Sequence, residues 1–160
     1  MVPWVQDFIR NSPFAVLASS NADGFCDASP KGGPPGFIKV VNEKRLLIPD
    51  ISGNRLFQTY ENIETNSFIG IVFLVPGMEA TSRVNGKVTV FRPGEAEFEE
   101  MTSEAFSAEE LESIQQLLVL DVVESYSHCP KSLTQAQIWD TARIEANRTK
   151  SPIAPWVPGT

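Results

Sequence analysis

From Phe14 onward the chain is divided into short runs rich in Val, Ile and Phe, separated by residues typical of turns. Runs of this length, with turn residues between them, predict an antiparallel sheet or barrel rather than a bundle of helices. We therefore predict a mainly-β (α+β) fold built on a six-stranded antiparallel β-barrel with helices inserted at its ends. The runs cover residues 14–19, 25–29, 37–41, 45–49, 68–75, 81–92 and 117–126.

Helices are expected between these runs. Apolar residues recur at helical spacing in residues 4–9 and again in residues 53–66. A third helix is expected to begin at Ser107, because Ser107 and Glu110 have the spacing of a capping box. Residues 131–143 are expected to be irregular or helical.

The length of the chain favours a single domain. Its 160 residues, 42% of them hydrophobic, suffice for one domain with a core and are too few for two ordinary domains. We predict one domain over residues 1–148 and an extended, proline-rich C-terminal arm over residues 149–160.

The charge and the cysteines exclude several kinds of partner. A formal net charge of -7 argues against nucleic acid, because affinity for a phosphate backbone comes from clustered Lys and Arg. Cys26 and Cys129 lie far apart and show no metal-ligand spacing, so we expect reduced thiols in a cytoplasmic protein and no metal site. Neither a signal peptide nor an apolar run of about 20 residues is present, so no membrane partner is expected.

Two loops are the best candidates for a ligand site. Residues 27–37 and 49–55 are both dense in Gly, Pro and small polar residues, and each lies beside an expected strand and carries one cation. Such loops often bind anions. At the start of the helix expected over 53–66, Arg55 could bind a phosphate together with backbone N–H groups, or it could lie on the surface while Ser52 caps the helix. Lys31 could reach the same anion or could simply keep an exposed loop soluble.

The strand expected over residues 81–92 offers a second set of candidates. Arg83 shares a face with Thr81 and Asn85, so this face could line a ligand cleft or could be an ordinary solvated face. Gly86 interrupts the strand and indicates a bulge or a close approach of two backbones. We assign no catalytic side chain, and any chemistry would come from a cofactor.

Six motifs in this order resemble the pyridoxamine 5'-phosphate oxidase-like flavoprotein superfamily. They lie within residues 14–140, and the resemblance implies a split β-barrel, a homodimer, and FMN bound in clefts at the dimer interface. The motifs are Asp27-x-Ser-Pro-Lys-Gly with Pro-Gly-Phe37, Pro49-Asp-x-x-Gly-Asn-Arg55, Asn62-Ile, Phe73-Leu-Val-Pro-Gly77, Arg83-Val-Asn-Gly86, and His128-Cys-Pro-Lys131 with Ile138-Trp139.

The resemblance also implies which residues surround the cofactor. Arg55 matches the arginine that binds the FMN phosphate, and Lys31 lies in a segment that borders the flavin and its phosphate. Trp139 is expected to be an apolar wall for the flavin ring. The full set of expected cofactor-binding residues is Asp27, Ser29, Lys31, Pro49, Asp50, Asn54, Arg55, Thr81, Arg83, Lys131 and Trp139.

One motif departs from the family pattern. Close relatives have an Arg-Ser pair where this chain has Gln135 and Ala136, which removes a charge-assisted contact and implies weaker FMN binding or a different ligand. The resemblance favours an FMN-dependent oxidoreductase that acts on a small molecule. Alternatives are a flavin-binding or sensing protein without turnover, or the same scaffold with deazaflavin or with haem, for which His128 is the single histidine. Oxidation of vitamin B6 itself is not expected, because the residues that hold the phosphate of that substrate cannot be placed.

Overall fold

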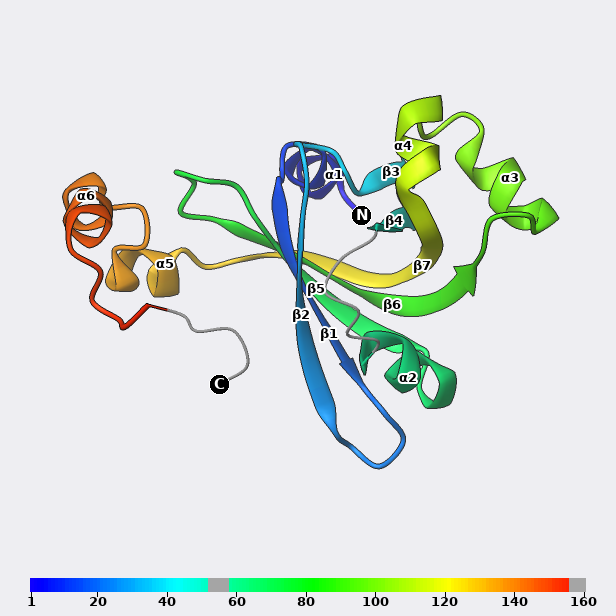
Figure 1. Ribbon diagram of the computed structural model, residues 1–160, viewed down its shortest axis with the longest axis horizontal. Helices are drawn as coiled ribbons and strands as arrows, with labels where there is room; N and C mark the ends of the chain where they lie inside the picture. Colours follow the sequence, from blue (N-terminus) through cyan, green and yellow to red (C-terminus); the bar gives the residue numbers. More distant parts are fainter. Residues whose placement is uncertain (52–57, 156–160) are drawn as a thin grey trace.

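A curved antiparallel sheet of seven strands forms the centre of the molecule (Figure 1). The computed structural model describes residues 1–51 and 58–155 of the chain. The order across the sheet is β2-β1-β5-β6-β7-β4-β3, so β2 and β3 are its two edges and the barrel is split between them. The predicted fold is confirmed, but the count of six strands was wrong, because all seven apolar runs form strands. The strands are β1 (Phe14–Ser20), β2 (Cys26–Gly32), β3 (Lys39–Asn42), β4 (Arg45–Ile51), β5 (Phe68–Leu74), β6 (Thr81–Phe91) and β7 (Ile114–His128).

Alternation along the strands directs one set of side chains into the barrel. The pairing register places Leu17 of β1 opposite Ile71 of β5, and Ala15 opposite Phe73. All four residues are buried, whereas the residues between them on each strand are more exposed. These side chains belong to the main hydrophobic core, which fills the inside of the barrel.

The strand β4 is buried on both faces. Leu46 and Ile48 contribute to the main core, whereas Leu47 packs in a second core with Phe98 and Phe106. Helices α3 (Ala96–Thr102) and α4 (Ala108–Ser113) belong to the segment that supplies these two phenylalanines. This segment covers the outer face of β4 and therefore explains why three consecutive residues of that strand are apolar.

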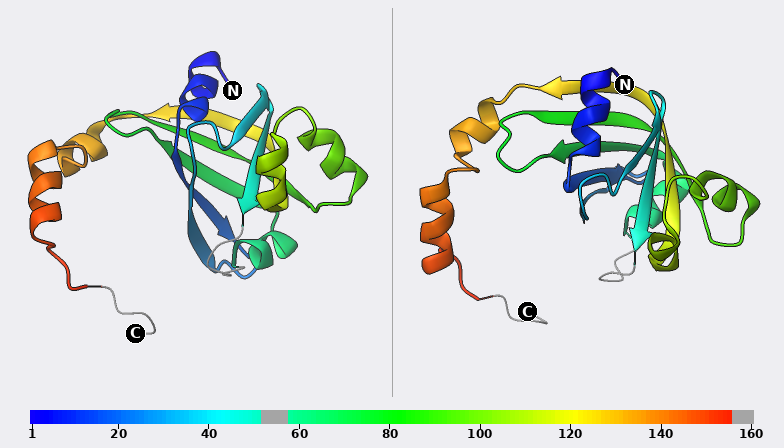
Figure 2. Two further views of the ribbon diagram at one scale, coloured as in Figure 1. Left: turned by 45° about the horizontal axis from the view of Figure 1, so that its top comes forward. Right: turned by 90° about the horizontal axis from the view of Figure 1, so that it is seen from above.

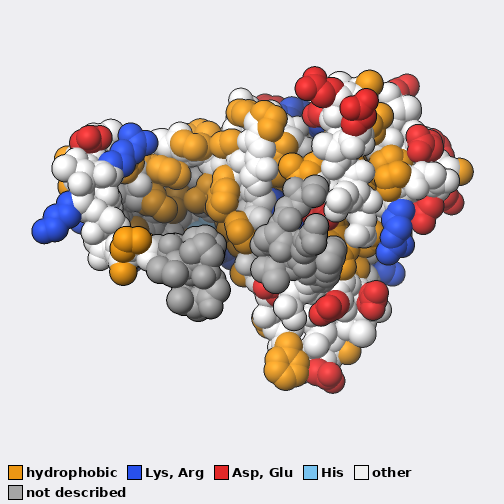
Figure 3. Space-filling model, in the orientation of Figure 1, with side chains coloured by type: hydrophobic (Ala, Val, Ile, Leu, Met, Phe, Trp, Pro, Cys, Tyr) orange, Lys and Arg blue, Asp and Glu red, His pale blue; other side chains and the backbone are white. Residues whose placement is uncertain are grey.

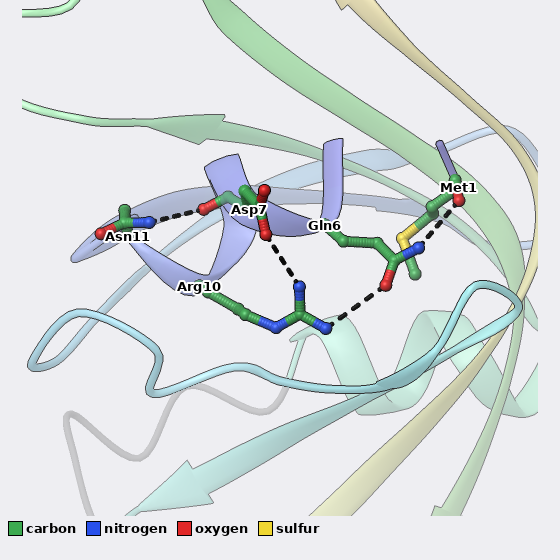
Figure 4. Close-up of polar contacts among 5 residues, drawn as sticks. All are labelled: Met1, Gln6, Asp7, Arg10 and Asn11. Carbon is green, nitrogen blue, oxygen red and sulfur yellow. Dashed lines mark hydrogen bonds and ion pairs between the residues drawn. The ribbon is translucent and has the colours of Figure 1, made fainter. Parts of the chain in front are cut away.

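The predicted first helix is confirmed as α1 (Pro3–Arg10), which covers one end of the barrel (Figures 1 and 2). Its opposite face is polar, as expected for an amphipathic helix. Figure 4 shows the Arg10 guanidinium between two side chains of the same helix: Nη1 donates to Asp7 Oδ1 over 3.0 Å, and Nη2 donates to Gln6 Oε1 over 3.3 Å. The residues that α1 buries in the main core are Val5, Phe8 and Ile9.

The helix expected over residues 53–66 is confirmed for α2 (Gln58–Thr65), which packs against β1 and β2. A buried hydrogen bond fixes its position, because Asn62 Nδ2 donates to Ser19 Oγ over 3.0 Å. The first residues of the expected helix, including Asn54 and Arg55, lie outside the described residues.

The helix α4 begins with the expected capping box. Glu110 N donates to Ser107 Oγ, and Ser107 N donates to Glu110 Oε2 over 2.7 Å. Two backbone donors at the helix start are thereby satisfied. The prediction from the Ser107 and Glu110 spacing is confirmed.

The predicted break in β6 at Gly86 is also confirmed. The register between β6 and β7 shifts between Asn85 and Gly86. A Cβ atom on Gly86 would lie 2.2 Å from the carbonyl oxygen of Asp121, so the two backbones approach too closely for any side chain.

Helices α5 (Lys131–Ala136) and α6 (Thr141–Thr149) stand away from the barrel (Figures 1 and 2). Neither helix contains a buried residue. No helix in the described part of the chain is long and apolar enough to cross a membrane.

Candidate functional site

A cavity of about 780 Å³ opens where the barrel is split. Its walls come from β2 and the loop that follows it, the end of β4, the start of α2, the region of α4, and the start of β7. Its size lies within the range of small-molecule and cofactor sites. The lining residues used below are Asp27, Ser29, Lys31, Phe37, Asp50, Phe106, Glu110 and Ile114.

The polar wall of the cavity comes from the edge strand β2. Ser29 lies opposite Leu17 of β1, and Lys31 lies opposite Ala15, so these residues share the face that β1 turns into the barrel. The polar residues of β2 therefore point toward the split instead of toward solvent. Asp27 has the same parity, and the Thr59 hydroxyl lies 3.5 Å from its Oδ2 atom.

An ion pair crosses the split. Lys31 Nζ lies 3.1 Å from Asp50 Oδ1, and the two side chains are only 18% and 17% exposed. β2 is an edge strand and β4 is the strand next to the other edge, so the pair connects opposite sides of the open sheet. Because the pair is mostly shielded from water, its electrostatic attraction is screened less than that of a surface pair.

The Tyr60 hydroxyl lies beside the Asp50 carboxylate. The hydroxyl oxygen is buried and has no hydrogen-bond partner among the described residues. Burial first, and the nearby Asp50 carboxylate second, raise the pKa of Tyr60 well above its usual range. Tyr60 is therefore a neutral hydroxyl group with a proton available to donate.

Apolar residues also line the cavity, and a second ion pair lies next to one of them. Phe37, Phe106 and Ile114 are buried residues of the lining. Lys39 Nζ lies 2.8 Å from Glu110 Oε1 and 5.0 Å from the centroid of the Phe106 ring. This ammonium therefore links β3 to α4 through a hydrogen-bonded carboxylate and a cation–π contact.

The pKa of the Glu110 carboxyl is lowered from its ordinary value. The hydrogen bond from Lys39 is the largest cause, followed by the hydrogen bond from the Ser107 backbone N–H. Both contacts favour the charged form of the carboxylate. Glu110 thus joins the helix cap to the wall of the cavity.

The structure divides the predicted site residues into two groups. Asp27, Ser29, Lys31, Pro49 and Asp50 all line the cavity. Asn54 and Arg55 fall outside the described residues. The remaining four do not line this cavity; they lie near the start of β6, the end of β7 and the helices that follow, and they are Thr81, Arg83, Lys131 and Trp139.

The second group differs in burial from one residue to the next. Thr81 is buried opposite His128, whereas Arg83 is exposed opposite Tyr126. Lys131 is exposed at the start of α5. Trp139 is half-buried, and its Nε1 donates to the Met78 carbonyl oxygen over 2.9 Å.

The sequence did not point to one cation in this second region. Arg143 of α6 donates through Nη1 to the Ala136 carbonyl oxygen over 3.2 Å, and through Nη2 to Gln137 Oε1 over 2.8 Å. A guanidinium therefore lies beside the segment that contains Gln135 and Ala136. No sequence signal identified Arg143, because the contact depends on how α6 folds back on α5.

Metal-ligating residues do not cluster in the part of the chain that the structure describes, where no group of three or more His, Cys, Asp or Glu could hold a metal ion. Cys26 and Cys129 are both exposed free thiols. Cys26 lies on β2, and Cys129 directly follows β7.

The molecule is thus an antiparallel split barrel with a cavity of polar and apolar residues at its opening. The family model described as pyridoxamine 5'-phosphate oxidase matches residues 1–129. The chain belongs to this family. No curated protein sequence matches the chain.

Solved structures share the fold at low sequence identity. HupZ from Group A Streptococcus has a TM-score of 0.57 and 17% identity, and the match covers 79% of this chain and 93% of that one. An FMN-binding protein from Syntrophomonas wolfei has a TM-score of 0.57 and 10% identity, with coverages of 79% and 87%. The haem storage protein HutZ from Vibrio cholerae has a TM-score of 0.55 and 13% identity, with coverages of 79% and 92%.

Proposed function

We propose that the chain binds FMN in the cavity at the barrel opening and acts as an FMN-dependent oxidoreductase on a small molecule. The observation that carries the proposal is a mostly buried ammonium, Lys31, in a cavity that buried apolar residues also line. This combination fits a ligand with a phosphate at one end and a ring system at the other. The membership in the family and the likeness to an FMN-binding protein support the same ligand.

The described residues fit FMN in chemistry as well as in size. Lys31 and Ser29 would hold the phosphate, and Phe37, Phe106 and Ile114 form a wall suited to the flavin ring. The bound flavin would supply the exchange of hydride or electrons with the substrate. The protein would bind and orient the flavin and would keep water away from one side of it.

The second group of predicted residues leads us to propose a homodimer with FMN at the subunit interface. Thr81, Arg83, Lys131 and Trp139 do not line the cavity of their own chain, so a second chain would have to bring them there. Figure 3 shows hydrophobic side chains gathered in the hollow between the C-terminal helices and the barrel. Exposed Met78 and Ile138, each 43% exposed, belong to the two segments that meet there.

Charge also supports a second copy as the partner. Residues 131–150 hold four of the 13 Lys and Arg of the chain and two of its 20 Asp and Glu. This segment is therefore positively charged, whereas residues 1–130 are strongly acidic. A second copy would offer the acidic surface that complements the two C-terminal helices.

Haem and deazaflavin are the alternative cofactors on this scaffold. HutZ, a structural neighbour, is a haem storage protein. In this chain, His128 ends β7 and does not line the cavity, so the described residues offer no histidine ligand for haem there. Deazaflavin shares the ring system and phosphate of FMN, and only a direct comparison of affinities separates the two.

A titration tests the cofactor. Flavin-free protein is mixed with FMN, riboflavin, a deazaflavin and haem, and binding is followed by absorbance, flavin fluorescence and thermal unfolding. We expect FMN to bind most tightly, and at 100 times its dissociation constant it should add about 2.7 kcal/mol of stability. Absence of any shift with FMN would refute the proposal. Bleaching of the bound flavin by NADH or NADPH would support an enzyme over a binding protein without turnover.

Arg55 lies outside the described residues and is assigned by resemblance alone. If it binds the phosphate, Arg55→Ala should weaken FMN far more than riboflavin. Equal losses for both ligands would remove Arg55 from the phosphate site.

Mixed dimers test the shared site. Lys31→Met chains and Trp139→Ala chains should each form homodimers in which both sites are damaged. In a mixed dimer, one site combines the intact Lys31 of one chain with the intact Trp139 of the other. We expect FMN binding to return in mixtures, to about half of the sites of the mixed dimers. No recovery, in mixtures shown by mass to contain mixed dimers, would refute the shared site.

We also propose a reducing compartment such as the cytoplasm. The two exposed free thiols support this location, because such thiols are prone to oxidation outside the cell.

A further inference from the structure

The cation of the cavity is already paired. Lys31 Nζ is bound to Asp50 Oδ1 at 3.1 Å, and both side chains are more than four-fifths shielded from water. An anion that approaches Lys31 therefore meets an ammonium whose charge is compensated. A small free anion gains little there, because it must compete with a carboxylate that is held in place by the fold.

The rest of the described lining does not offset this competition. Asp27 and Glu110 also line the cavity, so its described wall holds three carboxylates and one ammonium. Glu110 is bound to Lys39, which leaves Asp27 and Asp50 as the carboxylates on the side of Lys31. The described part of the lining is thus unfavourable for a free anion.

A carboxylate that releases Lys31 needs another hydrogen-bond donor. The Tyr60 hydroxyl is buried, which raises its pKa, and it lies beside the Asp50 carboxylate, which raises the pKa of Tyr60 further, both as a nearby charge and as a hydrogen-bond acceptor. At ordinary hydrogen-bond distance and angle the hydroxyl has no partner among the described residues, so it is a neutral donor near neutral pH. Tyr60 is therefore placed to donate to Asp50 when Lys31 turns to a ligand.

We propose that Asp50 is a specificity-determining residue that keeps Lys31 from binding small free anions. Asp50 releases Lys31, by turning to the Tyr60 hydroxyl, only when the ligand is a phosphate joined to a ring that packs against the apolar residues of the cavity. The proposal rests on the proposed binding of FMN for the identity of that ligand. It assigns to Asp50 a role in selection instead of a direct contact with the cofactor. The contacts of the ring with Phe37 and Phe106 supply the free energy that a free phosphate lacks.

The first experiment uses inorganic phosphate and flavin-free protein. Binding of phosphate is measured by calorimetry at constant ionic strength for the wild type and for Asp50→Asn, which has nearly the same shape but no charge. We expect the substitution to raise the affinity for phosphate at least tenfold, because it frees a mostly buried ammonium. Unchanged or weaker binding would overturn the proposal.

Asp27→Asn is the matched control. It removes the same charge from the same cavity, on the face of β2 that also carries Lys31, but leaves the pair between Lys31 and Asp50 intact. We expect a gain in phosphate affinity of less than about threefold, since charges separated by a longer distance interact more weakly. Equal gains in both variants would show that only the total charge matters, and would overturn the role of Asp50.

Tyr60→Phe tests whether the Asp50 carboxylate turns from Lys31 to the Tyr60 hydroxyl. We expect the affinity for FMN to fall about tenfold, the size of one hydrogen bond to a charged group, and the affinity for riboflavin to stay unchanged. The variant should unfold at the same temperature or a higher one, because the hydroxyl it removes is buried without a partner. Equal losses for FMN and riboflavin would show that Tyr60 acts through packing, which would overturn its role as the second partner of Asp50.

The phosphate experiment separates this inference from the proposed function. If wild-type protein fails to bind FMN while Asp50→Asn gains phosphate, FMN is the wrong ligand and Asp50 still protects Lys31. If FMN binds and Asp50→Asn gains nothing, the cofactor stands and the role of Asp50 is refuted.

Discussion

The barrel opening and the outer surface near the end of β7 each hold part of the predicted site, but they hold it in different ways. At the opening, Lys31 and Asp50 are fixed by contacts between strands from opposite sides of the sheet. On the outer surface, Arg83 and Lys131 are exposed. The described residues of the first region contact one another within one chain, whereas Arg83 and Lys131 of the second region face solvent.

Two ion pairs of the sheet differ in the same way in how much they stabilise the fold. Lys31–Asp50 at the opening has a separation of 3.1 Å, and Arg45–Asp121 between β4 and β7 has one of 2.7 Å. The shorter pair is 43% and 57% exposed, whereas the longer pair is 18% and 17% exposed. Exposure rather than length decides what each pair contributes, because water screens the charges and competes for their hydrogen bonds.

The largest loss of stability should come from a substitution among the apolar residues that line the cavity. Phe106 is 7% exposed and packs in the second core, so Phe106→Ala should lower the free energy of unfolding by about 3 kcal/mol. Urea unfolding measures this change. Phe25→Ala is the control, because Phe25 is 73% exposed and its loss should cost less than about 0.5 kcal/mol. Similar losses in both variants would contradict the burial of Phe106.

Removing one partner of an ion pair should destabilise the protein less than the loss of Phe106. Lys31→Met leaves the Asp50 carboxylate mostly buried without its ammonium partner, which should destabilise the protein by about 2 kcal/mol at neutral pH. Arg45→Met removes one partner of the exposed pair and should cost less than about 1 kcal/mol. Urea unfolding is measured for both variants and for Lys31→Met/Asp50→Asn, which should recover part of the loss. If the two single variants were equally destabilised, exposure would not explain the contrast.

The sequence predicted the fold because its signals are local. Alternating apolar residues, the Ser107 and Glu110 capping box and Gly86 each depend on neighbours in the chain, and all three predictions were confirmed. The strand count was wrong, because all seven apolar runs that the sequence shows form strands, including the short edge strand β3, Lys39–Asn42.

The site could be predicted only where the chain itself brings residues together. Asp27, Ser29 and Lys31 share one face of one strand, so alternation alone places them side by side. Glu110 reaches the cavity, and Tyr60 reaches Asp50, through tertiary packing, and no periodicity or spacing indicates which distant residues will face each other. For the same reason, the sequence could not show that Thr81 and Arg83 would lie outside the cavity.

Trp139 tests the outer surface with a smaller effect on stability. Its Nε1 donates to the Met78 carbonyl oxygen over 2.9 Å at an exposed position, so Trp139→Phe should lower the free energy of unfolding by less than about 1 kcal/mol. If a second chain brings this residue to the flavin, FMN affinity should fall about tenfold while the fold persists. Thermal unfolding and a flavin titration on the same samples measure both quantities. A large loss of stability with unchanged FMN affinity would make Trp139 a structural residue.

The smallest effect concerns the Glu110 carboxylate at the opening, and it should depend on pH. Lys39 and the Ser107 N–H lower the pKa of Glu110 in the folded protein, so the charged form stabilises the fold at pH values above the ordinary glutamate pKa. This contribution is lost as the pH falls through the lowered pKa, where the folded protein must also take up the proton. Because the side chain is 41% exposed, Glu110→Gln should cost less than about 1 kcal/mol at pH 7. Thermal unfolding from pH 7 down to pH 3 should show the difference between wild type and Glu110→Gln shrinking toward acid; a difference that stays constant would mean that the contact acts through shape and not through charge.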